Sequence, residues 1–209
     1  MNWQKYFEMM VDWKKLPAYR AEPRIDSLIG FYLPEMISDF LSDKIVGIIP
    51  EFPLRLGTLK PELQGTIYAE LSYKVDFYLL GASGTNYFIE FKTDSGSRND
   101  SQDKYLKKAA ELSMNDIVEG IISISKASTY KMKYSHLLNK LKRLSLLDES
   151  GVYASRSDEI RIVYVQPSNK DGAKNCIEFI QIAEWLKRKG GINSFEYHFA
   201  AALIAWAKD

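Results

Sequence analysis

The spacing of hydrophobic positions divides the chain into helical and extended stretches. Residues 3–16 place aromatic and methionine side chains on one helical stripe and end before a proline, which predicts an amphipathic helix. Residues 26–41 again have a helical period, and Pro34 must either kink this helix or open a second one at its first turn. Residues 45–56 follow as a predicted strand.

In the middle of the chain the pattern changes to period two. Apolar and charged residues alternate from Leu71 onward and again over residues 86–93, so each predicted strand has a core face and a face that carries charge. The loop between them is predicted at residues 82–84, because its glycine supplies the left-handed conformation that such a hairpin needs. This loop fixes the register and places Asp76 directly opposite Glu90.

The remaining pattern predicts helices around a central sheet. Residues 116–125 satisfy either period, and we favour helix. The other expected helices are 101–112, 135–147, 181–189 and 194–208, and the other expected strands are 159–166 and 176–180. This order predicts an α/β fold with a mixed central β-sheet flanked by helices on both faces.

Composition excludes several classes of protein. The 209 residues suit one domain, and 28 basic against 27 acidic residues leave a formal charge of +1, so no global field attracts polyanions. A single cysteine excludes an intramolecular disulfide, and two histidines form no zinc ligand set of the usual spacing. The longest apolar run, residues 199–207, is too short to span a bilayer, and the charged first residues predict no secretory signal. We therefore expect a cytoplasmic protein without membrane contact.

The predicted hairpin brings chemically active residues together. Opposed residues of an antiparallel pair share a face with Cβ atoms about 4.5–5.5 Å apart, so Asp76 and Glu90 repel each other unless a cation lies between them. Lys92 projects from the same face, roughly 6.5–7 Å farther along the strand. Two carboxylates on rigid strands suit a magnesium ion that activates water, and phosphodiester hydrolysis is the matching reaction. Alternatively, these residues and Lys74 form a salt-bridge network on a solvent-facing sheet.

The run VDFYLLGASGTNYFIEFKTD resembles the core of the PD-(D/E)XK nuclease superfamily, which has the restriction-endonuclease-like fold. Asp76 matches the motif aspartate and Glu90-Phe91-Lys92 matches E-x-K, whereas Val75 replaces the motif's proline. The resemblance implies a nuclease domain with an N-terminal helical extension (1–25), a core (26–166) and a C-terminal strand with helices (167–209). It also implies Mg²⁺ or Mn²⁺ on Asp76, Glu90 and the Phe91 carbonyl, with Lys92 positioning the attacking water and DNA as the expected substrate.

The family often adds a further acid from the helix before the sheet. Glu35, beside Pro34, is the best positional match, and Glu51 in the first strand is the competitor. Some branches also place a glutamine and a tyrosine on the helix after E-x-K, and Gln102 and Tyr105 resemble that pair with a spacing one residue short. Arg98, in the preceding loop, is a candidate phosphate contact or an ordinary surface arginine.

Residues 126–147 contain six basic residues and no acid, which gives this stretch a local charge of +6. Such a stretch either holds a nucleic-acid backbone or is the solvated face of an amphipathic helix. Within it, Lys140, Lys142 and Arg143 are the predicted nucleic-acid contacts.

Two further hypotheses stay open at this point. The fold can serve as a catalytically inactive module that binds nucleic acid or protein, because fold alone does not determine activity. The aromatic N-terminal helix either belongs to the core or pairs with a second copy in a homodimer.

Overall fold

The structure, a computed structural model, describes residues 2–16, 22–93, 100–154, 157–170 and 172–208. The chain divides into two compact units. Unit 1 comprises Met1–Met36, Glu90–Arg98 and Val163–Asp209, and unit 2 comprises Ile37–Ile89 and Asn99–Ile162. The single domain expected from length stays a prediction. In the described residues, no helix has the length and apolar character that crossing a bilayer requires.

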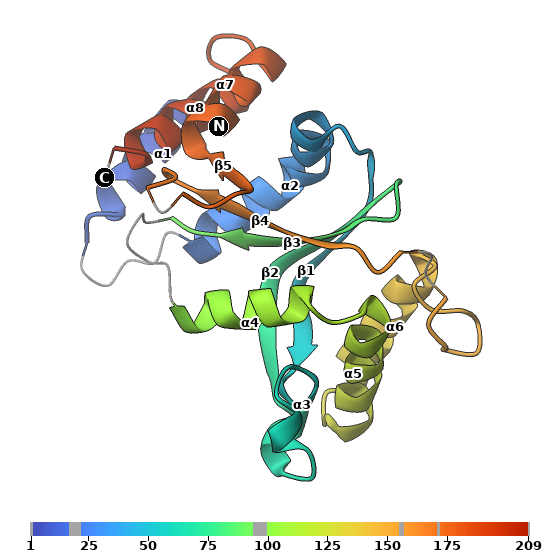
Figure 1. Cartoon of the computed structure of the whole chain (residues 1–209). Coiled ribbons are helices and arrows are strands. Elements are labelled where there is room, and N and C mark those ends of the chain that lie inside the picture. Colours follow the sequence, from blue (N-terminus) through green and yellow to red (C-terminus); the bar gives the residue numbers. More distant parts are fainter. Residues whose placement is uncertain (1, 17–21, 94–99, 155–156, 171, 209) are drawn as a thin grey trace. The chain divides into compact units, whose positions relative to one another are not determined.

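The strands form a mixed sheet, as the sequence predicts (Figure 1). The order in the sheet follows the chain, and the first three strands pair antiparallel whereas the last two pair parallel. The strands are β1 (Ile45–Arg55), β2 (Ser72–Gly81), β3 (Asn86–Phe91), β4 (Ile160–Gln166) and β5 (Cys176–Glu178). An α/β fold with a mixed sheet is therefore confirmed, and its restriction-endonuclease-like character stays a prediction.

Within unit 2, the β2–β3 hairpin has the predicted loop and register. Phe77 pairs with Ile89, and Leu80 pairs with Asn86. Gly84 has a φ of 91°, the left-handed conformation that the loop requires. Asp43 holds the loop from outside, because its carboxylate accepts hydrogen bonds from the backbone N–H and the hydroxyl of Ser83.

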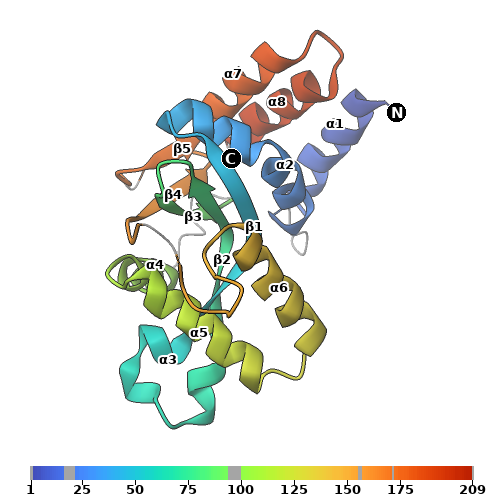
Figure 2. The ribbon, with the colours of Figure 1, turned by 90° about the vertical axis from the view of Figure 1, so that its right-hand side faces the viewer.

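Helices lie on both faces of β2 in unit 2. The helices of unit 2 are α3 (Leu56–Leu59), in the connection between β1 and β2, α4 (Asp100–Ala110), α5 (Met114–Ala127) and α6 (Lys131–Arg143), with short 3-10 turns at Pro61–Leu63 and Ile67–Glu70. Tyr73 stacks on Tyr105 of α4, with ring centroids 5.3 Å apart. The next residue, Lys74, projects from the other face and lines a groove beside α6. Figure 2 shows α6 alongside β1.

The remaining helices build an aromatic core in unit 1. They are α1 (Trp3–Trp13), α7 (Phe179–Lys189) and α8 (Phe195–Trp206), together with most of α2 (Glu22–Leu41), which contains Pro34. Phe7 of α1 is buried and stacks on Phe199 of α8, with centroids 5.3 Å apart. The N-terminal helix therefore contributes to the core of its own chain, and the possible homodimer stays a prediction.

Candidate functional site

The E-x-K residues of unit 1 form a buried ion pair at the end of β3. The Nζ atom of Lys92 lies 2.6 Å from Oε1 of Glu90, and the two side chains are only 8% and 2% exposed. Both project from the same face because they are two residues apart on an extended chain. The backbone N–H of Lys92 donates to the carbonyl of Val165, 2.8 Å away, and this bond holds the residue beside β4.

The burial of this ion pair has an energetic cost. Desolvating an ammonium and a carboxylate costs several kcal/mol per ion, and their attraction offsets that cost only in good geometry. Replacing a buried ion pair by hydrophobic residues of similar volume is often neutral or stabilising. A buried acid and lysine in contact are therefore a candidate functional site.

Asp76 lies in unit 2, half-buried on β2. It shares a face with Lys74, two residues earlier on the strand. In unit 2 the paired register of β2 and β3 extends as far as the Phe77–Ile89 pair. The approach of Asp76 to Glu90 stays a prediction.

Glu51 of β1 is the acid that the register of unit 2 brings opposite Asp76. Pro50 pairs with Phe77 and Phe52 pairs with Val75, so the residues between these two pairs face each other. Glu51 has a φ of 51°, which costs a residue with a side chain about 1–2 kcal/mol. Strain of this kind is concentrated at functional sites. The sequence placed Glu51 second because Glu35 is the better positional match to the resemblance, and no sequence pattern signals a left-handed glutamate within a strand.

Glu35, the first choice for the additional acid, lies on α2 in unit 1. Its carboxylate is exposed and forms an ion pair with Lys189 of α7. Glu51 also has a partner, because its Oε2 atom lies 3.0 Å from Nζ of Lys74. Ion pairing therefore does not separate the two candidates. Glu51 differs from Glu35 in its register position opposite Asp76 and in its left-handed backbone.

Of the predicted nucleic-acid contacts at α4 and in the loop before it, the structure describes the side chain of Tyr105 only. Arg98 and the side chain of Gln102 lie outside the described residues. Tyr105 is half-buried, stacked on Tyr73 and covered by the ammonium of Lys60, 4.9 Å from its ring centroid. Tyr105 therefore packs against residues of its own unit, and its contact with nucleic acid stays a prediction.

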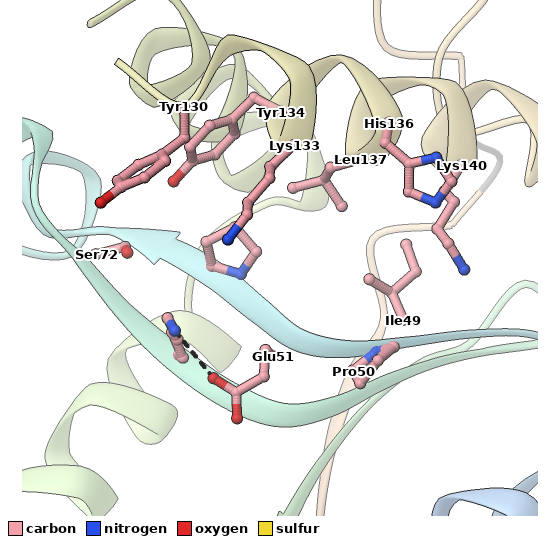
Figure 3. Close-up of a pocket in the computed structure, with 12 residues that line it drawn as sticks. Ile49, Pro50, Glu51, Ser72, Tyr130, Lys133, Tyr134, His136, Leu137 and Lys140 are labelled. Atoms are coloured by element: carbon pink, nitrogen blue, oxygen red, sulfur yellow. Dashed lines mark hydrogen bonds and ion pairs between the residues drawn. The ribbon is translucent and has the colours of Figure 1, made fainter. Parts of the chain in front are cut away.

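Within the basic stretch, the lysines of α6 have different environments. Lys142 donates to the backbone carbonyl of Glu149 at 2.8 Å, and Arg143 is exposed at the end of the helix. Lys140 instead lines a groove of about 560 Å³, which we call the α6 groove. One wall comes from α6 and its N-cap residue, and the other comes from β1 and the start of β2 (Figure 3). The helical wall consists of Tyr130, Lys133, Tyr134, His136, Leu137 and Lys140.

In the parts of the chain that the structure describes, no group of three or more His, Cys, Asp or Glu side chains is arranged to hold a metal ion. Magnesium is commonly bound by only one or two carboxylates, with waters and substrate oxygens completing its shell. The donor set proposed from the sequence, two carboxylates and a backbone carbonyl, consists of the hard oxygen ligands that this ion prefers. The residues therefore fit the ion in chemical type.

Comparison of the chain with protein-family models, curated proteins and solved structures finds no match. We consequently infer function from the residues and their geometry.

Proposed function

We propose that the chain is a metal-dependent nuclease that hydrolyses phosphodiester bonds, with DNA as the expected substrate and Mg²⁺ or Mn²⁺ as the cofactor. The buried pair of Glu90 and Lys92 is the observation that carries the proposal. An acid next to an ammonium, both withdrawn from water, is suited to a reaction in which negative charge develops on a phosphate.

The hairpin register supports the participation of a second acid. The pairs Phe77–Ile89 and Tyr78–Phe88 have the register that the sequence predicts. Extending that register by one residue assigns Asp76 to Glu90. Because neighbouring carboxylates repel each other, such a pair favours a bound cation.

The proposed roles follow from the chemistry of each group. Asp76, Glu90 and the carbonyl of Phe91 would hold the ion, and Glu51 is our choice for the additional acid. The ion, when bound, supplies Lewis acidity and lowers the pKa of a bound water. The ammonium of Lys92 would orient the attacking water and offset charge on the phosphate.

Asp76→Asn provides the test, because it removes a charge without leaving an unpaired buried lysine. Cleavage of plasmid DNA, single-stranded DNA and RNA is measured with Mg²⁺, Mn²⁺ or a chelator. We expect metal-dependent cleavage by the wild-type protein and a loss of about 100-fold or more in the variant, a typical effect of removing one charge-stabilising group.

The matched control is Asp12→Asn on α1. Asp12 belongs to the other acid-x-Lys sequence of this chain, Asp12-Trp13-Lys14, and is exposed. Its substitution makes the same chemical change away from the proposed site and should leave cleavage unaltered. Full activity in Asp76→Asn, or wild-type protein that cleaves none of the three polymers with either metal, would refute the proposal. Metal-independent binding without cleavage would instead support the binding-module hypothesis.

A further inference from the structure

The α6 groove has the size of a small-molecule site and lies entirely within unit 2. Its volume of about 560 Å³ falls within the range of ligand pockets. Two walls of different character enclose it. The wall from β1 and β2 includes prolines and Ile49, whereas the helical wall presents rings and amino groups (Figure 3).

The charge of the groove is positive. Three lysines and one glutamate line it, and the glutamate, Glu51, is paired with Lys74 at 3.0 Å. Lys133 and Lys140 therefore supply a net charge of +2. They are seven residues apart on α6, which is two helical turns or roughly 10 Å along the axis. This spacing gives the groove two separate contacts for an extended anion.

The groove also offers aromatic faces beside these cations. Tyr130 is 66% exposed, and the ammonium of Lys133 lies 5.4 Å from its ring centroid. Tyr134 is half-buried, and burial raises the pKa of its hydroxyl although the charge of Lys74 opposes the shift. Its hydroxyl consequently remains a neutral donor at physiological pH.

The strand wall connects the groove to the proposed catalytic acid. Ser72 and Lys74 line the groove, and Asp76 follows on the same face of β2 because side chains alternate along a strand. Two residues of extended chain span roughly 6.5–7 Å. A polymer lying in the groove would therefore be close to the Asp76 carboxylate.

The geometry points to the α6 groove as a binding site for single-stranded nucleic acid, with a base stacked on Tyr130 and phosphates held by Lys133 and Lys140. Exposed rings next to lysines are typical of single-strand sites, where every base offers a face for stacking. In a duplex these faces are covered by neighbouring bases, so a single strand fits this site better. Binding rests on the groove alone, and its role as the substrate path rests on the proposed nuclease function.

The test is fluorescence anisotropy with a labelled oligothymidylate of about 12 nucleotides, a length in the range of single-strand sites. A chelator is present so that cleavage does not occur. Tyr130→Ala should weaken binding roughly tenfold, whereas Tyr130→Phe should stay within about twofold of the wild type because its ring still stacks. Circular dichroism melts check that the variants remain folded.

The lysines are tested by the dependence of affinity on salt. Lys133→Ala and Lys140→Ala should each reduce the slope of log affinity against log salt by about 0.7, the expected value for one phosphate contact on a single strand. Lys5→Ala, on an exposed position of α1 in unit 1, removes the same charge and should not change the slope. A duplex of the same length should bind more weakly than the single strand.

Binding and cleavage separate the two proposals. Oligonucleotide binding that depends on Tyr130, in a protein that cleaves nothing with either metal, supports the groove and refutes the nuclease. Metal-dependent cleavage combined with Tyr130→Ala binding at wild-type strength refutes the groove. Absence of wild-type binding, or equal binding of duplex and single strand, also overturns the single-strand site.

Discussion

The amino group of Lys92 lies 2.6 Å from the carboxylate of Glu90, and both side chains are almost fully buried. The two charges belong to one strand end and depend on each other, because removing either one leaves the other with less charge compensation in a low-dielectric environment. This ion pair should therefore affect the free energy of unfolding, independently of any role in catalysis.

Removing one member of this pair should destabilise the protein more than removing both. We expect Glu90→Gln and Lys92→Met each to lower the free energy of unfolding by about 3 kcal/mol or more, and the double variant to recover much of that loss. Urea unfolding of the four proteins completes the cycle. Losses that simply add in the double variant would show that the two groups do not interact energetically.

The hairpin loop gives a prediction about stability and pH. Burial raises the pKa of Asp43, but hydrogen bonds from Ser83 and Tyr87 outweigh burial and hold the pKa below its ordinary value. A carboxyl whose pKa is lower in the folded state stabilises the fold above its unfolded pKa of about 4. This contribution is lost as pH falls through the folded pKa.

Asp43→Asn should therefore lower the free energy of unfolding by about 1–2 kcal/mol at pH 7. This is less than the roughly 1.5–3 kcal/mol of hydrogen bonds to a charged group, because the carboxylate is partly exposed to water. The difference between wild type and variant should shrink below pH 4. Urea unfolding from pH 2.5 to pH 7 measures it. A difference that does not vary with pH would exclude the carboxylate charge as its source.

The elements that local pattern determines were predicted well. Alternation along residues 71–79 and 86–93, with Gly84 between them, was enough to give the β2–β3 register, because a tight loop and a period of two leave one pairing. Helix in residues 116–125 is confirmed by α5, which Ser113 caps by accepting from the backbone N–H of Asp116. Such signals lie within a few residues of the structure that they determine.

Features that depend on distant contacts could not be predicted. The segment after β1 contains α3 and two 3-10 turns, which are too short for a hydrophobic period, and Arg55 and Glu70 close it through an ion pair. The pattern also assigned Glu90 and Lys92 to a face that carries charge, without showing that this face is covered. Alternation identifies a face, but only the packing of other elements determines whether water reaches it.

Gly84 should be sensitive to substitution for conformational and steric reasons. Its φ is 91°, and an added Cβ would lie 3.2 Å from Cβ of Ser157. Gly84→Ala should therefore destabilise the protein by about 1–2 kcal/mol. Gly65→Ala is the control, because its φ of 81° carries a similar conformational cost and its added Cβ meets nothing within 4 Å. Thermal melts should show the larger decrease for Gly84→Ala, and equal decreases would mean that Ser157 adds no cost.

Substitutions at Glu51 can separate the energetic cost of its left-handed backbone from the chemical role of its carboxylate. Its φ of 51° is left-handed, so glycine at this position relieves a cost that alanine keeps, while both remove the carboxylate. Glu51→Gly should therefore be about 1 kcal/mol more stable than Glu51→Ala in urea unfolding. If Glu51 is the additional acid, the rate of metal-dependent cleavage should fall about tenfold or more in both variants. The loss should occur even in Glu51→Gly, whose backbone is not strained. Glu35→Ala, which removes the competing acid on α2, should keep its cleavage activity. The opposite result, with cleavage lost in Glu35→Ala and kept in both Glu51 variants, would assign the additional acid to the helix.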